Sequence, residues 1–136
     1  MARFEYELTV SSSVIDENGH ANNVEYLRWM QDAAIAHSDL VGCSGATLAD
    51  EASWFVRSHH IEYLSPAKAG DRVVVRTWVV DMRRVASLRR YEIVRADGKQ
   101  MLARGETDWV YIDRATGKPK TIADPIRTMF GVIERS

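Results

Sequence analysis

The sequence lacks the features of an exported or membrane-bound protein. It contains one cysteine, Cys43, so an intramolecular disulfide is impossible and a secreted disulfide scaffold is excluded. No run of about 18 apolar residues is present, which argues against a membrane-spanning helix. The first residues are charged and include no apolar segment, so we expect no signal peptide, no membrane partner and a cytoplasmic protein.

An excess of charge of one sign is also missing. The 18 lysines and arginines nearly balance the 19 aspartates and glutamates. A broad nucleic-acid surface needs a strongly basic balance, so we expect no nucleic-acid partner, whereas a local basic patch for a phosphate-bearing ligand stays open. The four histidines and the cysteine show no HExxH or CxxC spacing, and we predict neither a metal nor another cofactor.

What the sequence does contain is enough apolar material for a core. Hydrophobic residues make up 46% of the 136 residues. A chain of this length is typical of one domain, so we expect residues 1–136 to form a single one. No internal repeat, linker or low-complexity segment divides it.

One long helix is predicted near the start of the chain. Residues 3–10 alternate apolar and polar, which predicts a half-buried strand. After a loop, Asn22 is a good N-cap, Glu25 has the spacing of a capping box, and Gly42 is a natural stop. The helical face is formed by residues at steps of three and four: Tyr26, Met30, Ala33, His37 and Leu40. We expect residues 42–52 to be irregular.

Four further strands are predicted after this helix, over 54–63, 72–81, 87–95 and 100–113. Asp97-Gly98 predicts a hairpin between the last two, and Asp124-Pro125 predicts a short helix with Asp124 as its cap. One helix is too little to cover a parallel sheet on both faces, so the class is α+β with an antiparallel sheet. The open edges of such a sheet favour pairing between subunits, and we expect a homodimer or a larger assembly.

The segment from Asp16 to Trp29 is the first candidate site. Asp16 by itself fits a turn residue, but it also fits a nucleophile or general base facing a carbonyl docked at the helix start. The backbone N–H of Asn23 is one of the unpaired donors at that helix start. His20 has two readings of equal weight: a loop histidine bonded to backbone, or a group that orients the carboxylate or donates to the substrate.

This segment resembles the signature of the hotdog-fold thioesterases of the 4-hydroxybenzoyl-CoA thioesterase-like group. The matching residues are Asp16, Gly19, His20, Asn22, Asn23, Tyr26 and Trp29. Two later segments, residues 60–71 and 103–107, are similar to the family as well. The serines at 11–13 depart from its pattern and leave the shape of the acyl pocket open.

The resemblance implies a long central helix wrapped by a curved antiparallel sheet of about five to six strands. It implies hydrolysis of thioesters of coenzyme A or acyl carrier protein by a homodimer or a dimer of dimers, in which the partner subunit contributes to the site. Asp16 would then be the nucleophile or base, with His20 beside it, and the amide of Asn23 would polarise the carbonyl. Substrate-binding residues would be Gly19, Asn22, Tyr26, Ser58, His59 and His60.

Two pairs of arginines are candidates for phosphate binding. Arg83, Arg84, Arg89 and Arg90 fit either a solvated surface or a seat for the phosphates of coenzyme A.

A hotdog hydratase is one alternative function, but its Asp-x-Asn-x-x-His pattern does not match, because His20 follows Asn18 by two residues. A non-catalytic acyl-thioester-binding protein is the other, and the intact Asp16 argues against it.

Overall fold

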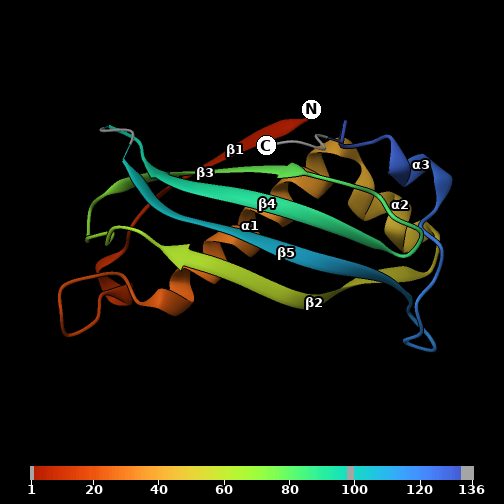
Figure 1. Cartoon of the computed structure of the whole chain (residues 1–136), viewed down its shortest axis with the longest axis horizontal. Helices are drawn as coiled ribbons and strands as arrows, with labels where there is room; N and C mark the ends of the chain where they lie inside the picture. Colours follow the sequence, from red (N-terminus) through yellow and green to blue (C-terminus); the bar gives the residue numbers. More distant parts are fainter. Residues whose placement is uncertain (1, 98–99, 133–136) are drawn as a thin grey trace.

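The computed structural model describes residues 2–97 and 100–132, which form a curved sheet packed against one long helix (Figure 1). The strands are β1 (Arg3–Thr9), β2 (Ala52–Tyr63), β3 (Arg72–Val79), β4 (Ala86–Arg95) and β5 (Met101–Asp113). The helices are α1 (Asn23–Val41), α2 (Cys43–Ala49) and α3 (Asp124–Arg127), with a 3-10 turn at Ser12–Val14. The predicted α+β class is therefore confirmed.

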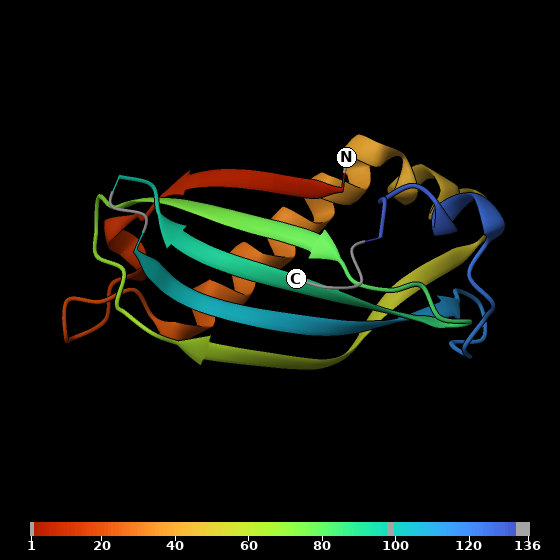
Figure 2. The same ribbon diagram turned by 45° about the horizontal axis from the view of Figure 1, so that its top comes forward.

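The five strands form one antiparallel sheet in the order β1-β3-β4-β5-β2. The chain places β1 at one edge and then passes through α1 and α2 to reach β2 at the opposite edge (Figure 2). The remaining strands fill the space between the edges. The 12 residues of β2 pair on one side only, with β5, and the register of this pair shifts between Val56 and Ser58.

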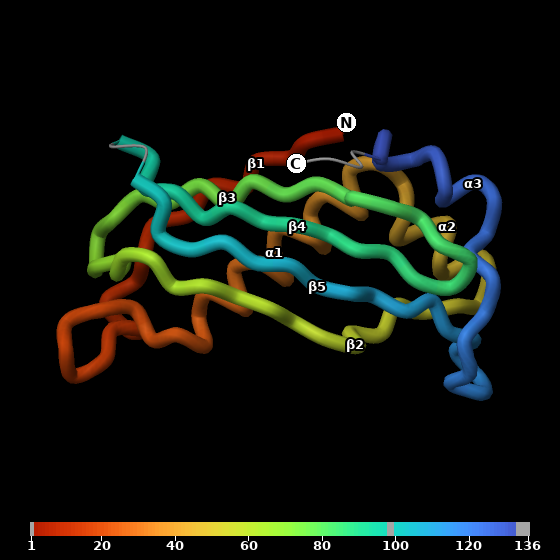
Figure 3. Tube along the Cα trace, viewed as in Figure 1, coloured from red at the N-terminus to blue at the C-terminus, as the bar shows by residue number. Residues whose placement is uncertain are grey.

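Helix α1 crosses behind the sheet (Figure 3). The Asn22 side chain caps it by accepting a hydrogen bond from the N–H of Val24, as predicted. The capping box does not form, because the N–H of Asn22 donates to the carbonyl of Val14 and Glu25 lies beside Arg28. The buried face is Tyr26, Trp29, Met30, Ala33, Ala34 and His37, so the prediction that Leu40 shares it is wrong.

Met30 of α1 packs against the sheet at Gly105 of β5. Met30 is fully buried, and its Cε lies 3.2 Å from the position that a Cβ on Gly105 of β5 would take. The main core joins this helical face to the inward side chains of β3, β4 and β5. A second apolar cluster around Tyr111, Ile122 and Ile126 fills the end of the molecule where α2 and α3 lie.

Three local predictions differ from the structure. Residues 43–49 form helix α2, because Gly42 at φ +91° ends α1 and lets the chain turn into a second helix. The cap of α3 is Ala123, so Asp124 is its first helical residue. The predicted turn at Asp97-Gly98 lies partly outside the described residues. No helix in the described part of the chain has the length and apolar character needed to cross a membrane.

Candidate active site at the start of helix α1

Asp16 lies in a tight loop whose backbone holds its carboxylate in place. Its Oδ1 accepts hydrogen bonds from the N–H groups of Asn18 at 2.9 Å and His20 at 3.2 Å. The backbone closes the loop through Asp16 N–H to His20 carbonyl, at 2.8 Å. Gly19 adopts φ +77°, which favours glycine and makes the turn possible. Asp16 is exposed, and its Oδ2 has no hydrogen-bond partner among residues 2–97 and 100–132.

His20 takes part in this loop through its backbone. Its N–H donates to Asp16 Oδ1, while no hydrogen bond joins its half-buried ring to a described residue. The ring therefore does not orient the Asp16 carboxylate in this arrangement. Among the described residues the His20 ring bonds neither to backbone nor to the Asp16 carboxylate, and a contact with substrate stays a prediction.

The first turn of α1 presents an open donor next to this loop. Asn22 caps Val24, and its own N–H is occupied by Val14. The N–H of Asn23 has no acceptor in the described segments, as expected for the first residue of a helix. Asn22 and Asn23 are both exposed, so a ligand can reach this helix end. The partial positive charge of a helix N-terminus adds to the pull of that donor on an oxygen.

Tyr26 secures the position of this helix end. It is buried, its hydroxyl accepts a hydrogen bond from the N–H of Ala67 at 2.9 Å, and burial raises the pKa of that hydroxyl. The ring of Tyr63 packs edge-on against it at 5.2 Å, and the Tyr63 hydroxyl donates to the carbonyl of Asn23. The Ala67 carbonyl in turn accepts from the N–H of Ala21. Tyr26 thus ties the loop, the helix and the segment after β2 together.

Three of the predicted residues meet elsewhere, on the side of the sheet away from α1. Ser58, His60 and Arg83 line a polar depression of about 350 Å³ together with Asp81, Leu88, Glu106 and Asp108. Its lining does not include Asp16 or His20. Within one chain, therefore, these residues of β2 lie apart from the Asp16 loop.

His59 points to the opposite side of β2. Its Nδ1 lies 2.8 Å from the hydroxyl of Thr107, which is fully buried in β5. Burial lowers the pKa of His59. His59 and His60 therefore lie on opposite faces of β2.

The four arginines do not form one phosphate seat. Arg83 is paired with Asp108 and Asp81, and Arg90 with Glu106. Arg84 is exposed, and its Nη1 donates a 3.4 Å hydrogen bond to the hydroxyl of Thr121. Arg89 is 3% exposed and faces the helix, so the prediction that it belongs with the other three is wrong. The alternation of β4 sends adjacent residues to opposite faces.

A buried polar cluster on the helix side was missed at the sequence level. Arg89 Nη1 donates to Nδ1 of His37 and to the hydroxyl of Thr77, both at 3.0 Å. Each of these residues is buried on the inward face of its own element: His37 in α1, Thr77 in β3 and Arg89 in β4. The sequence feature that indicates this cluster is the strand alternation, which puts Arg89 on the same buried face of β4 as Ser87 and Tyr91. In the described ranges, no three histidine, cysteine, aspartate or glutamate side chains are grouped to hold a metal ion.

Comparison with known proteins identifies the family. Residues 10–130 match the family model described as the thioesterase-like superfamily. The chain belongs to this superfamily. The match includes the Asp16 loop, all of α1 and four of the five strands in full. The loop and helix start described above are therefore those of a thioesterase-like protein.

A curated relative points in the same direction over part of its length. The chain is 28% identical over 116 residues to an L-carnitine dehydrogenase/betainyl-CoA thioesterase from Ruegeria pomeroyi. The match covers 82% of this chain and 23% of that protein. The thioesterase-like chain thus spans about a quarter of the length of the curated relative.

Solved structures confirm the hotdog fold. A 1,4-dihydroxy-2-naphthoyl-CoA thioesterase from Synechocystis superposes with a TM-score of 0.86 at 22% identity, covering 98% of this chain and 99% of that chain. The protein SAV2348 from Staphylococcus aureus, solved in complex with CoA, gives a TM-score of 0.84 at 19% identity and covers 93% of this chain and 80% of its own. At these identities the likeness establishes the fold.

Proposed function

We propose that this thioesterase-like protein hydrolyses acyl thioesters of coenzyme A to the free acid and the thiol. The main support for the proposal is that an open carboxylate oxygen and an open backbone N–H both lie at the start of α1. Among the described residues, the Asp16 carboxylate is held through Oδ1 with Oδ2 open, and the N–H of Asn23, seven residues later, has no acceptor. The names of the relatives support coenzyme A as the carrier. Acyl carrier protein is the second possible carrier.

The chemistry follows from these two groups. The thioester carbonyl oxygen would accept from the Asn23 N–H, which stabilises the negative charge that develops on that oxygen. Asp16 would either attack the carbonyl carbon, forming an anhydride that water then opens, or remove a proton from an attacking water. In both routes the carbon–sulfur bond breaks, and the thiolate leaves and takes up a proton. The net reaction consumes one water and releases one acid and one thiol.

Among Arg83, Arg84 and Arg90, Arg84 is the most open to a phosphate. Its guanidinium is exposed and has no carboxylate partner within residues 2–97 and 100–132, unlike those of Arg83 and Arg90. Arginine presents a planar fork of donors that suits phosphate oxygens. We also propose phosphate contacts from Arg83 and Arg90. Each of these two arginines must first release its carboxylate partner, Asp108 or Glu106.

The proposal includes a homodimer or a dimer of dimers. Strand β2 is an edge strand of 12 residues, and Phe55 on it is 59% exposed. Long edge strands with exposed apolar side chains are prone to pair with another chain. A second copy at this edge would also bring Ser58, His59 and His60 of the partner subunit's β2 next to the first copy.

A panel of acyl-CoA thioesters with detection of the released thiol tests the function. The panel should include short, long and aromatic acyl groups, because the acyl preference is not part of the proposal. Hydrolysis of at least one member is expected. No thiol release from any member would overturn the proposal for coenzyme A. Loss of absorbance of an enoyl-CoA without thiol release would instead identify a hydratase.

A further inference from the structure

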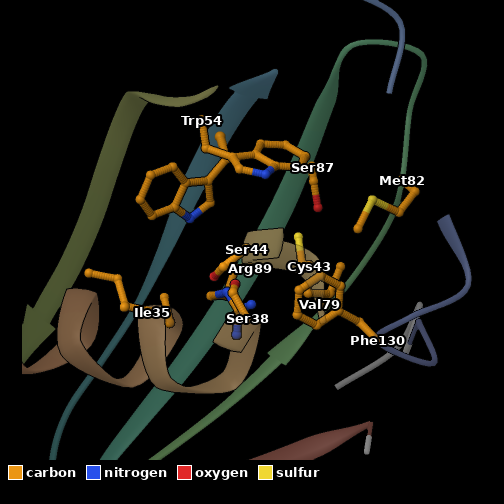
Figure 4. Close-up of a pocket in the computed structure, with 12 residues that line it drawn as sticks. Ile35, Ser38, Cys43, Ser44, Trp54, Val79, Met82, Ser87, Arg89 and Phe130 are labelled. Atoms are coloured by element: carbon orange, nitrogen blue, oxygen red, sulfur yellow. The ribbon is translucent and has the colours of Figure 1, made fainter. Parts of the chain in front are cut away.

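A second cavity lies at the other end of α1 from Asp16. It has a volume of about 280 Å³ and opens between α1, α2 and the sheet. Its lining includes Ile35 and Ser38 of α1, Trp54 of β2, Arg89 of β4, and Met82 and Phe130. In Figure 4, Trp54 and Ile35 lie on one side of the cavity and Met82 and Phe130 on the other. Along the helix, Ala34 is about 18 Å from the cap residue Asn22.

Arg89 is the one charged side chain in this lining. It is 3% exposed, and Nη1 donates to His37 Nδ1 and Thr77 Oγ1. Its guanidinium carbon lies 5.1 Å over the ring of Phe130. Nε and Nη2 have no hydrogen-bond acceptor among the described residues. No carboxylate in the described part of the chain forms an ion pair with it.

A buried cation of this kind is costly without an anion. Burial lowers the pKa of Arg89, but a guanidinium starts from such a high value that it stays charged in proteins. The partners that it has are neutral: a hydroxyl, the ring of Phe130, and a His37 nitrogen that must be unprotonated to accept. Buried charges are ordinarily paired with an opposite charge. The guanidinium of Arg89 therefore places a positive charge at the wall of an open cavity.

The rest of the lining suits an apolar ligand. Trp54, Trp109, Phe130, Val79 and Met82 surround the space, and Ser38, Ser44 and Ser87 supply hydroxyls. A mostly apolar cavity with a few convergent polar groups is the usual form of a small-molecule site. Its size suits a ring or a short alkyl chain and excludes a coenzyme A molecule.

We propose that this cavity binds a carboxylate carried on a short apolar stem, with the carboxylate on Nε and Nη2 of Arg89. Two parallel N–H to oxygen bonds fit the fork of a guanidinium, and the stem lies among the aromatic side chains. The carboxylate can belong to a free acid or to the far end of an acyl group. Nothing in the motif around Asp16 requires this site, and it therefore goes beyond the proposed hydrolysis.

Calorimetric titration with phenylacetate and with its neutral amide, phenylacetamide, tests the charge requirement on the whole protein. The two probes have the same shape and differ in charge. Phenylacetate should bind at least about tenfold more tightly, since hydrogen bonds between charged partners are stronger than neutral ones. Arg89→Met should abolish this preference, and Arg114→Met, which removes an exposed arginine outside the cavity, should keep it. Equal binding of the two probes, or a preference that survives Arg89→Met, would overturn the proposal.

A second variant keeps the test decisive if Arg89→Met does not fold. Ser38→Leu leaves Arg89 in place and fills the space beside it, so binding of phenylacetate should be lost. Undiminished binding to folded Ser38→Leu would show that the probe sits elsewhere and would overturn the site.

The source of the carboxylate is decided by hexadecanedioyl-CoA and palmitoyl-CoA, whose acyl chains have the same length and can span the distance of about 18 Å along α1. This arm rests on the proposed thioesterase activity, whereas the calorimetry does not, so failure of one is distinguishable from failure of the other. Faster turnover of hexadecanedioyl-CoA in the wild type, lost in Arg89→Met, would support the acyl end as the ligand. Phenylacetate binding without that preference would support a free acid.

Discussion

The hydroxyl of Tyr26 accepts a hydrogen bond from the backbone N–H of Ala67 at 2.9 Å, and both residues are buried. This bond ties the first turn of α1 to the segment that follows β2. It also explains why Tyr26, which the resemblance placed in substrate binding, lies within the core. The position of the Asn23 N–H therefore depends on a contact between segments about 40 residues apart in the sequence.

Tyr26→Phe should destabilise the protein by about 1–3 kcal/mol, because the Ala67 N–H would be left buried without an acceptor. Urea unfolding measures the free energy. Tyr63→Phe is the matched control: its hydroxyl donates to the Asn23 carbonyl at an exposed site, so its loss should cost less. An equal loss of unfolding free energy in the two variants would contradict the stabilising role of the buried hydrogen bond between Tyr26 and Ala67.

Asp16→Asn should reduce kcat for acyl-CoA hydrolysis by about 10²- to 10⁴-fold, the usual contribution of a general base. The amide oxygen of asparagine can still accept from the N–H groups of Asn18 and His20, so the loop should keep its shape. Glu17→Gln removes the neighbouring exposed carboxylate and should leave kcat unchanged. Unaltered turnover in Asp16→Asn would exclude Asp16 as the reacting group.

Gly105→Ala should destabilise the fold by about 1–3 kcal/mol, as expected when a methyl is forced into packed structure. The new Cβ would lie 2.8 Å from the carbonyl oxygen of His60, a backbone atom that cannot move aside freely. Gly45→Ala in α2 is the control, since its Cβ would meet nothing within 4 Å, and alanine favours a helix. Melting temperatures should fall for the first variant and rise or hold for the second.

His59 should make folding less favourable as the pH falls. Burial places its folded-state pKa below the unfolded value near 6.5, so the unfolded chain binds more protons in that range. Stability should therefore be full above about pH 7 and decline as the pH drops through the unfolded pKa. An NMR titration should give a His59 pKa below 6.5. His59→Gln should reduce the decline in the free energy of unfolding with falling pH. If the slope of that decline does not change, other titrating groups cause it.

Sedimentation should show a dimer or a tetramer. The exposed Phe55 on the edge strand β2 is the residue to change, because it adds apolar area where a second copy would pair. Phe55→Lys should shift the mass toward the monomer, while Lys68→Ala, at an exposed residue outside the strands, should not. A wild-type protein that stays monomeric at high concentration would contradict the proposed assembly.

The sequence by itself determined the local structure. The alternating strands, the Asn22 cap and the Gly42 stop are patterns within a few residues, and they agree with β1, α1 and the three strands from β3 to β5. The Asp16 loop was also visible, because aspartate, glycine and histidine at that spacing make their hydrogen bonds to one another. Helix α2 was not, since its seven residues carry a glycine and no clear apolar period.

The tertiary structure alone decided which distant residues meet. It placed Ser58 and His60 with Arg83 on the outer side of the sheet, turned Arg89 inward to His37 and Thr77, and buried Tyr26 against Ala67. Each of these contacts joins different elements, and the order and register of the strands set them. Charge and exposure of a side chain follow from those long-range contacts, so adjacent arginines in the sequence, Arg89 and Arg90, have opposite environments in the fold.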